Sequence, residues 1–425
     1  MKLIPRLPTA SRPRTTLAAV TAASALLLTA CGGSGGDGEQ KAADEKQTLT
    51  VWGMGEEGKH LQTLGEEFEK ENPNITVEVT PIGWDVVHQK LISAVAAGEL
   101  PDMAQMGSTM MGEFIALDAL EPVDTRTFQK SDFFPAAWEG NVKDGETYGV
   151  PWYVDTRVLY YRTDLAEKAG IDEAPETWED MSSLASGYKE KAGTQWGAYL
   201  QPSNTGAWQT FVPFLFSAGG SLLGEDGKPA LNSPETVEAL TEYGAYAEKG
   251  LSAKSVPPGF DPVKTFGNDR TPMFVSGPWI VNLLNEQQPQ IKGDWAAVPL
   301  PAGPDGGKSW VGGSSLVTFA DSGHKAAAEK FTAYLTGTKE QADWYEMSSS
   351  LPANQAAWDE PEVSGTKGLD VFRTQLESSE PIPPMEKWEE FAAKVDEAVS
   401  RVTQKGEDPK KAAAWLQQAT EGLAG

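Results

Sequence analysis

The sequence predicts an α/β fold built as two lobes. Short β-rich runs alternate with amphipathic helical stretches along almost the whole chain, which is the pattern of α/β domains. Roughly 375 residues follow the N-terminal region, more than a single hydrophobic core ordinarily serves, so two lobes are expected. The sequence shows no internal repeat and no second apolar stretch long enough to span a membrane.

The individual elements follow from hydrophobic periodicity. Strands are expected at 48–52, 75–79, 102–105 and 157–161. Apolar residues three or four apart mark helices at Leu61-Leu64-Phe68, Val87-Leu91-Val95, Phe114-Leu117, Val237-Leu240-Tyr243, Phe331-Leu335, Phe391-Val395-Val399 and 412–423. Thr177, three residues before Asp180, is expected to cap a further helix.

The first 30 residues resemble a bacterial lipoprotein signal peptide. A basic region that contains Arg12 and Arg14 precedes the apolar stretch 17–30, which ends at Cys31, the only cysteine. The small residues before Cys31 resemble a lipobox, where a diacylglyceryl group is added to the cysteine and the chain is cut just before it. Two acyl chains give stable membrane anchoring. An ordinary secretory signal with an unmodified cysteine is the alternative.

Gly, Ser and charged residues dominate 31–46, which is expected to be a flexible tether.

Composition excludes several functions. The 61 acidic residues exceed the 35 Lys and Arg residues, so the surface is expected to repel nucleic acids and anionic lipid headgroups. With Cys31 modified, no disulfide and no thiol nucleophile remain.

Tryptophans at turns are the strongest sign of a binding site. Of the 14 Trp residues, several lie beside Gly, Pro or Asp rather than within apolar stripes. The turn set comprises Trp84, Trp152, Trp208, Trp279 and Trp310. An indole covers the apolar face of a sugar ring, while carboxylate, guanidinium and amide groups bind its hydroxyls. The alternative is that these side chains fill the cores of the lobes.

Signals for catalysis or metal binding are poor. His60, His88 and His324 are far apart and lack a zinc-type spacing. The segment 303–309 is similar to a phosphate-binding loop but has one residue too few between its outer glycines. We therefore expect no enzyme activity, no metal and no cofactor.

Three segments, in order, resemble the family 1 extracellular solute-binding proteins, the carbohydrate-binding components of ABC importers, which include the maltose and trehalose binders. The first is 144–165, around Pro151-Trp152-Tyr153-Val154-Asp155-Thr156-Arg157. The second is 273–279, which ends in Gly277-Pro278-Trp279, and the third is 310–316, from Trp310 through Gly312-Gly313.

The resemblance implies a periplasmic-binding-protein-like fold of type II, in which hinged lobes enclose a central cleft. The expected order is a signal peptide at 1–30 and a tether at 31–46, a first lobe from 47–152 plus 310–350, and a second lobe from 153–309 plus 351–425. Ligand binding closes the cleft by hinge motion, and the closed form is recognised by the importer.

The resemblance also assigns roles to residues. Glu57 and Asp155 are expected to accept hydrogen bonds from sugar hydroxyls, and Tyr153, Trp279 and Trp310 to stack on sugar rings. Further expected ligand-binding residues are Ser108, Gln201, Gly312, Gly313 and, for additional subsites, Trp84, Trp208 and Trp388. For Arg157, two roles stay open: binding sugar hydroxyls, or pairing with an acidic residue of the cleft.

The expected function is capture of a di- or oligosaccharide and its delivery to the permease of an ABC importer. The protein is expected to be a monomer, held by its lipid anchor on the outer face of a cell membrane of the Gram-positive type, without nucleic-acid partners. The alternatives are a lipid-anchored glycoside hydrolase, a surface adhesin that binds carbohydrate, and a relative that binds a polyol or sugar phosphate. The sequence does not distinguish between maltose-like, trehalose-like, cello-, xylo- and chito-oligosaccharides.

Overall fold

Two sheets organise the part of the chain that the computed structural model describes, namely residues 40–42, 45–55, 57–203, 206–256, 259–366 and 368–424. The predicted signal peptide, the lipidation site Cys31 and residues 31–39 of the predicted tether lie outside the described residues. The end of that tether is held in place, because the Lys41 amide donates to the Gly323 carbonyl at 3.1 Å and the Gln40 side chain donates to the Ser322 carbonyl at 2.8 Å.

The larger sheet belongs to the first lobe and has the strand order β11-β6-β10-β3-β1-β2, with β12 paired to the start of β10. Its strands are β1 (Gln47–Met54), β2 (Ile75–Ile82), β3 (Met103–Gly107), β6 (Val150–Asp155), β10 (Ser309–Thr318), β11 (Leu351–Pro352) and β12 (Ser379–Pro381). β1 is parallel to β2 and β3, whereas β10 is antiparallel to β3 and β6. The carboxyl ends of β1, β2 and β3 therefore meet at one edge, where ligands bind in open α/β sheets.

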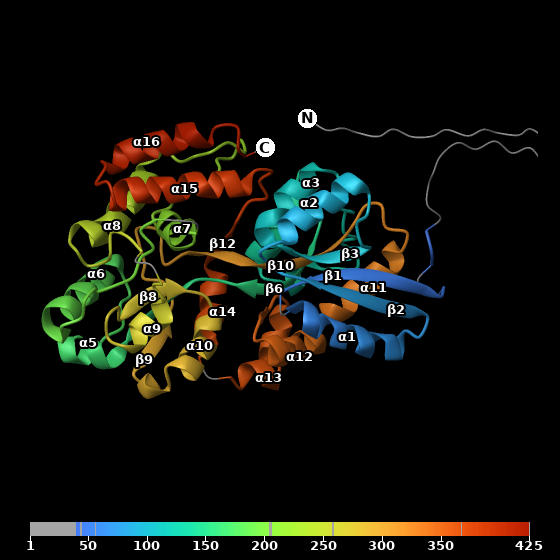
Figure 1. Ribbon diagram of the computed structural model, residues 1–425, viewed down its shortest axis with the longest axis horizontal. Helices are drawn as coiled ribbons and strands as arrows, with labels where there is room; N and C mark the ends of the chain where they lie inside the picture. The colour runs from blue at the N-terminus through green and yellow to red at the C-terminus, as the bar shows by residue number, and fades with distance from the viewer. Residues whose placement is uncertain are drawn as a thin grey trace, which may run out of the picture. The chain divides into compact units, whose positions relative to one another are not determined.

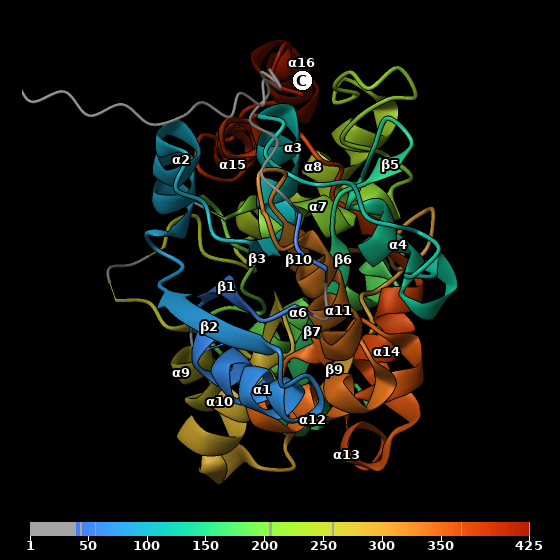
Figure 2. The same cartoon turned by 90° about the vertical axis from the view of Figure 1, so that its right-hand side faces the viewer.

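Helices cover both faces of this sheet (Figures 1 and 2). On one face lie α1 (Glu57–Glu71), α11 (Lys325–Leu335) and α12 (Thr338–Ser348), and on the other α2 (Val87–Ala97) and α3 (Met111–Ala116). The predicted stripes form the two cores: Leu61, Leu64 and Phe68 pack against Phe331 on the first face, and Leu91 packs with Phe114 on the second.

The second lobe contains a three-stranded sheet in the order β8-β7-β9. Its strands are β7 (Val158–Arg162), β8 (Met273–Ser276) and β9 (Trp295–Val298), and its helices are α5 (Thr163–Ala169), α6 (Trp178–Gly187), α7 (Trp208–Ser217), α8 (Pro234–Glu248), α9 (Pro262–Gly267), α10 (Trp279–Gln287), α15 (Trp388–Thr403) and α16 (Pro409–Thr420). The predicted cap is confirmed, since Thr177 and Asp180 form a reciprocal capping box at the start of α6.

The remaining short elements lie at turns and at the junction. They are β4 (Val142–Lys143), β5 (Glu146–Thr147), α4 (Pro135–Glu139), α13 (Pro361–Ser364), α14 (Asp370–Glu377), a π-helical turn η3 (Tyr188–Ala192), and the 3₁₀ turns η1 (Ser108–Met110), η2 (Lys130–Asp132), η4 (Pro289–Ile291) and η5 (Gln355–Asp359). None of the helices in the described ranges is both long and apolar enough to cross a bilayer.

The chain passes between the lobes at three places, in the middle of Figure 1. The first is the link from β6 to β7 at Thr156–Arg157, the second is the start of β10, and the third includes α14, which contacts both β10 and β7. The third crossing comes later than the expected boundary at residue 350, because Leu351 and Pro352 pair with β6 and α13 packs on α12. The open edge of β6 thus pairs with a strand that the resemblance had assigned to the second lobe.

Candidate functional site

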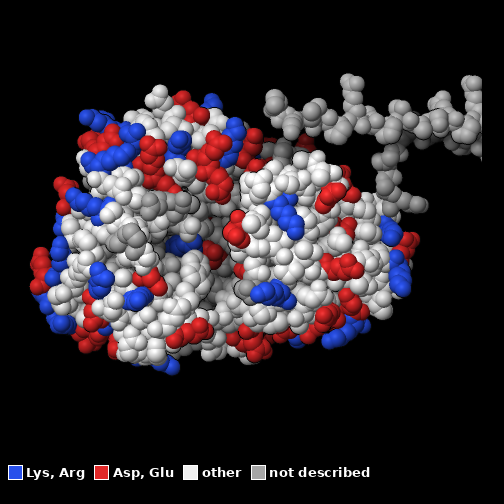
Figure 3. All heavy atoms as spheres, viewed as in Figure 1, with Lys and Arg blue, Asp and Glu red and all other residues white. Residues whose placement is uncertain are grey.

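A hollow separates the two lobes on the face seen in Figure 3, and both acidic and basic side chains are visible inside it. Four large hydrophobic side chains are exposed among the described residues: Trp84 at 40 %, Trp279 at 43 %, Val86 and Leu117. Trp84 follows β2 in the first lobe and Trp279 follows β8 in the second. Exposed indoles at strand ends on the two lobes mark this region as the candidate binding site.

A polar network forms the first-lobe side of the site. The Tyr153 hydroxyl on β6 donates to Glu57 Oε1 at 3.3 Å and accepts from Ser314 Oγ on β10 at 3.1 Å. Gln105 Nε2 on β3 donates to Ser314 Oγ at 3.3 Å and lies 3.4 Å from the Tyr153 hydroxyl. Burial, reinforced by the negative charge of Glu57, raises the pKa of Tyr153 well above its ordinary value, so the phenol stays a hydrogen-bond donor.

Trp84 and Glu57 flank the turn after β1. A Cβ built on Gly55 would lie 2.7 Å from the Trp84 ring and 2.8 Å from Glu57 Oε2, so both side chains lie against this glycine. Gly55 has φ +56°, and a Cβ on Gly107 at the end of β3 would lie 3.3 Å from the same ring. The glycines let the indole lie flat across the carboxyl ends of β1 and β3.

Trp279 opens α10 on the second-lobe side. A Cβ on Gly277 would lie 2.1 Å from its ring, so only glycine permits this position of the indole. The Tyr160 hydroxyl donates to the Gly277 carbonyl at 2.8 Å and holds the turn. The turn before Trp279 is therefore held in place, while the indole itself is 43 % exposed.

Arg157 lies between the aromatic groups at the first crossing. Its Nη1 donates to Asp155 Oδ1 at 2.9 Å and its Nη2 to Gln209 Oε1 at 2.8 Å. The guanidinium carbon lies 4.9 Å from the ring centre of Trp279 and 4.2 Å from that of Trp310, within cation–π range of both. In the structure Arg157 is paired with Asp155, as in the second of the two roles left open by the sequence.

Trp310, Trp208 and Trp388 form a buried aromatic wall behind this group. They are 4 %, 8 % and 3 % exposed. The ring centres of Trp208 and Trp310 lie 4.8 Å apart, those of Trp208 and Trp388 lie 4.9 Å apart, and Trp310 Nε1 donates to the Gln209 carbonyl at 3.0 Å. These three rings are largely covered by protein contacts, so they differ from Trp84 and Trp279, which are 40 % and 43 % exposed.

The two glycines of β10 are required by packing. A Cβ on Gly312 would lie 2.5 Å from Asp155 Oδ1 and 2.6 Å from the Trp310 ring. Gly313 has φ +111°, and a Cβ built on it would lie 2.1 Å from the Tyr153 carbonyl oxygen. The absence of side chains here lets β10 approach Tyr153 and Asp155 on β6 closely and leaves room for the ring of Trp310.

The two remaining expected residues lie at the end of β3 and after the segment that bridges β8. Ser108 begins η1 directly after β3 and lines a small hollow with Tyr153 and Gly312. Gln201 follows the segment whose Tyr199 pairs with Phe274 on β8, and its carbonyl accepts from the Tyr243 hydroxyl at 2.8 Å. Both are half-buried.

Asp155, Trp279 and Trp310, from three distant segments, all contact the single side chain of Arg157. Sequence reasoning missed Gln209, Gln105 and Ser314. Gln105 had a usable signal, since a glutamine inside a buried strand must satisfy its amide with other polar groups. For Gln209, near the start of α7, the local sequence held no such signal.

The described residues contain no group of His, Cys, Asp and Glu arranged to hold a metal ion. His88 Nε2 lies 2.6 Å from Glu113, and His324 Nδ1 lies 2.8 Å from the buried Asp102. These two histidines therefore have structural partners away from the site.

Two α/β lobes joined at three crossings, with an exposed indole at a strand end on each lobe and a polar network on the first, are typical of a solute-binding protein. Comparison with known proteins agrees: residues 52–342 match the model of the bacterial extracellular solute-binding proteins, and the chain belongs to this family.

Two curated relatives cover most of the chain. A putative binding protein of Brucella abortus is 28 % identical over 340 residues, which cover 79 % of this chain and 82 % of the relative. The sn-glycerol-3-phosphate-binding periplasmic protein UgpB of Escherichia coli is 25 % identical over 372 residues, with the same coverage of 79 % and 82 %.

Solved structures show the same fold. The sugar-binding protein MalE of Xanthomonas citri is 34 % identical, has a TM-score of 0.82 and matches over 88 % of this chain and 96 % of its own. The GacH receptor of Streptomyces glaucescens, solved unliganded and with acarbose, is 25 % identical, has a TM-score of 0.76 and matches over 89 % and 98 %. The two-lobe periplasmic-binding fold expected from the sequence is thereby confirmed.

Proposed function

We propose that this solute-binding protein captures a di- or oligosaccharide in the cleft and delivers it to the permease of an ABC importer. The observation that carries the proposal is the pair of exposed indoles, Trp84 and Trp279, one on each lobe. The similarity to the sugar-binding protein of Xanthomonas citri and to the acarbose receptor supports a saccharide as ligand.

The site offers what a sugar requires. Trp84 and Trp279 provide flat apolar faces for the C–H side of sugar rings. Glu57 and Asp155 each carry an oxygen that accepts hydroxyl hydrogen bonds, and Tyr153 adds a phenol that donates and accepts. Two aromatic faces on opposite lobes fit two or more sugar units better than one. The other proposed ligand contacts are Ser108, Gln201, Trp208, Trp310, Trp388 and the backbone of Gly312 and Gly313.

The charge of the site favours a neutral ligand. Arg157 is 5 % exposed, and its charge is balanced by Asp155 at 2.9 Å. A phosphate group would have to break this pair or remain beside the two carboxylates Glu57 and Asp155 without a free cation. We therefore place a neutral saccharide ahead of a sugar phosphate or glycerol phosphate.

We further propose that the protein is a monomer anchored through a lipidated Cys31 on the outer face of the membrane, and that it releases its ligand uncleaved. The lipid anchor is tested by metabolic labelling with a palmitate analogue, and Cys31→Ser should abolish the label. Release of the uncleaved ligand is tested by incubation with oligosaccharides and chromatography of the products, where cleavage would favour a glycoside hydrolase.

Calorimetry with a panel of ligands tests the main proposal. The panel comprises maltose, maltotriose, trehalose, cellobiose, xylobiose, chitobiose and sn-glycerol-3-phosphate. We expect at least one neutral saccharide to bind and Trp279→Ala to weaken it by about tenfold or more, or about 1.4 kcal/mol. Trp415→Ala, which removes a half-buried indole on α16, is the control and should leave affinity unchanged. Binding of the phosphate alone, or equal affinity of the Trp279 variant, would contradict the proposal.

A further inference from the structure

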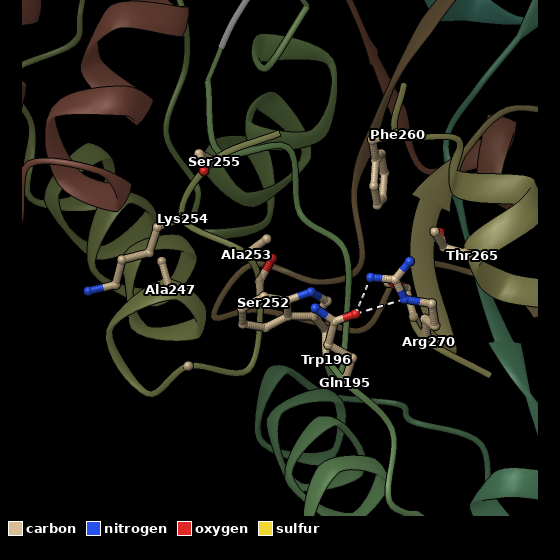
Figure 4. A pocket seen from close by; sticks show the side chains of 12 residues that line it. Gln195, Trp196, Ala247, Ser252, Ala253, Lys254, Ser255, Phe260, Thr265 and Arg270 are labelled. Carbon is tan, nitrogen blue, oxygen red and sulfur yellow. Dashed lines mark hydrogen bonds between the residues drawn. The ribbon is translucent and has the colours of Figure 1, made fainter. Parts of the chain in front are cut away.

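A second hollow lies within the second lobe, away from the cleft residues. Its volume is about 410 Å³, in the size range of small-molecule pockets. Figure 4 shows Arg270, Gln195 and Trp196 close together, with Phe260 and Thr265 on the neighbouring wall and the Lys254 side chain pointing away. The hollow is bounded by the segments before β8, after η3, and between α8 and α9.

Strand direction separates this hollow from the sugar site. The Trp196 amide donates to the Arg270 carbonyl at 3.0 Å, and three residues later Tyr199 pairs in parallel with Phe274 on β8. Both segments then continue toward the cleft, one to Gln201 and the other to Trp279. Trp196 and Arg270 therefore lie at the opposite ends of these strands from the cleft.

The hollow is cationic in a strongly acidic protein. The chain has 61 Asp and Glu residues against 35 Lys and Arg residues, yet none of the residues lining the hollow is acidic. The adjacent Asp269 is paired with Arg162 at 2.6 Å, and Lys189 Nζ donates to the carbonyl of Gly250 on the rim at 2.6 Å. This local absence of carboxylates favours an anionic ligand.

Arg270 has no carboxylate partner among the residues that the structure describes. Of the six arginines in the described residues, the other five each pair with an Asp or Glu. The Arg270 guanidinium instead donates from Nε to the neutral Oε1 of Gln195 at 2.7 Å, and its Nη2 donates to the same oxygen. The amide thus holds one edge of the planar guanidinium, and the other edge, formed by Nη1 and Nη2, is suited to a carboxylate or phosphate.

The walls add an apolar face and an unsatisfied polar group. The indole of Trp196, the ring of Phe260 and the methyl group of Ala253 line the hollow, and Phe260 packs on Tyr199 with ring centres 4.5 Å apart. Thr271 also lines it, and its hydroxyl oxygen is buried with no hydrogen-bond partner among the described residues. A buried hydroxyl without a partner is rare and points to an absent polar ligand or water.

We propose that this hollow is an accessory binding site for a small organic anion. The carboxylate or phosphate of the ligand pairs with Arg270, and a flat apolar ring lies along Trp196. The site is separate from the sugar cleft, so each is occupied without displacing the other.

Fluorine NMR of the full chain tests the proposal, with 4-fluorobenzoate as the probe and 4-fluorobenzyl alcohol as its uncharged match. We expect the acid to bind and the alcohol to bind at least about tenfold more weakly. Arg270→Gln should weaken the acid by about tenfold or more and leave cleft-ligand affinity unchanged, which also shows that the variant is folded. Arg373→Gln, which removes an arginine paired with Asp359, is the matched control and should leave probe binding unchanged.

Competition separates the possible sources and sites of binding. Displacement of the probe by inorganic phosphate in the wild type but not in Arg270→Gln supports an anion site that also accepts phosphate. Absence of probe binding, equal binding of acid and alcohol, displacement by the cleft saccharide, or an Arg270→Gln variant that binds as the wild type would each overturn the proposal. None of these results depends on which saccharide the cleft binds.

Discussion

Replacing Arg157 by Leu tests what holds the exposed indole of Trp279 in the second lobe. The change removes hydrogen bonds of 2.9 Å to Asp155 and 2.8 Å to Gln209 and the contacts with Trp279 and Trp310. Removing one partner of a buried ion pair costs about 3–5 kcal/mol of folding free energy. Asp155 retains 22 % side-chain exposure and regains some hydration, so we expect a loss of about 3 kcal/mol.

The same change is expected to weaken saccharide binding by about tenfold, although Arg157 is itself buried. The reason is indirect: without the guanidinium behind it, the Trp279 indole is no longer held in one orientation. Arg157→Lys keeps the charge but not the planar fork, so it should fall between the wild type and Arg157→Leu.

Chemical denaturation and calorimetry of a double-mutant cycle measure these effects. If Arg157 acts through Trp279, Arg157→Leu should lower affinity much less in a Trp279→Ala background, with a coupling of about 1 kcal/mol. Arg401→Leu is the matched control, because Arg401 also pairs with carboxylates and lies 4.0 Å over the Trp415 ring. It should lower stability without changing affinity. Unaltered sugar affinity in Arg157→Leu, or fully additive effects, would refute the reasoning.

Two further predictions follow from burial and charge. Trp84→Ala should lower saccharide affinity, measured by calorimetry, with little loss of stability, because Trp84 is 40 % exposed. Trp388→Ala should lower the free energy of unfolding, measured by chemical denaturation, by about 3–5 kcal/mol, because Trp388 is only 3 % exposed. A large loss of stability in Trp84→Ala and a small one in Trp388→Ala would contradict both assignments. Burial alone would raise the pKa of Asp102, but hydrogen bonds from Thr50, His324 and Ser322 outweigh it and hold the pKa below its ordinary value. The contribution of Asp102 to stability is therefore present above about pH 4 and is lost as the pH falls through the lowered pKa. Chemical denaturation at a series of pH values should show that Asp102→Asn loses less stability in acid than the wild type. An equal loss of stability in both proteins would count against this role.

The first lobe was the most predictable part of the fold. Alternating burial in β1 and the three- and four-residue spacing of Leu61, Leu64 and Phe68 reflect a sheet with helices on its faces, which local patterns encode. The short strand β11 was not predictable in this way. Two residues carry no periodicity, and their place in the first sheet depends on the open edge of β6.

The candidate site was predictable in its residues more than in their exposure. Trp84, Trp208, Trp279 and Trp310 all lie near glycines in the sequence, yet the structure exposes the first and third and buries the others. A glycine beside an indole permits close packing, and local sequence does not say whether a sheet, a helix or solvent covers the other face. Gln209 illustrates the same limit, because its role depends on Arg157, 52 residues earlier.

The arrangement around Arg157 divides the binding surface into groups with different tasks. Trp310 and Gln209 contact the guanidinium from behind, Asp155 neutralises it, and Trp279 covers it with its inner face. Each of these side chains comes from a different segment, and two of the segments, those of Asp155 and Trp310, adjoin a crossing between the lobes. A change in the crossing is therefore expected to alter the orientation of the exposed indole, because the same guanidinium contacts both. The Glu57–Tyr153–Ser314 network of the first lobe shares β6 and β10 with this group, so the two walls of the site are joined through these paired strands.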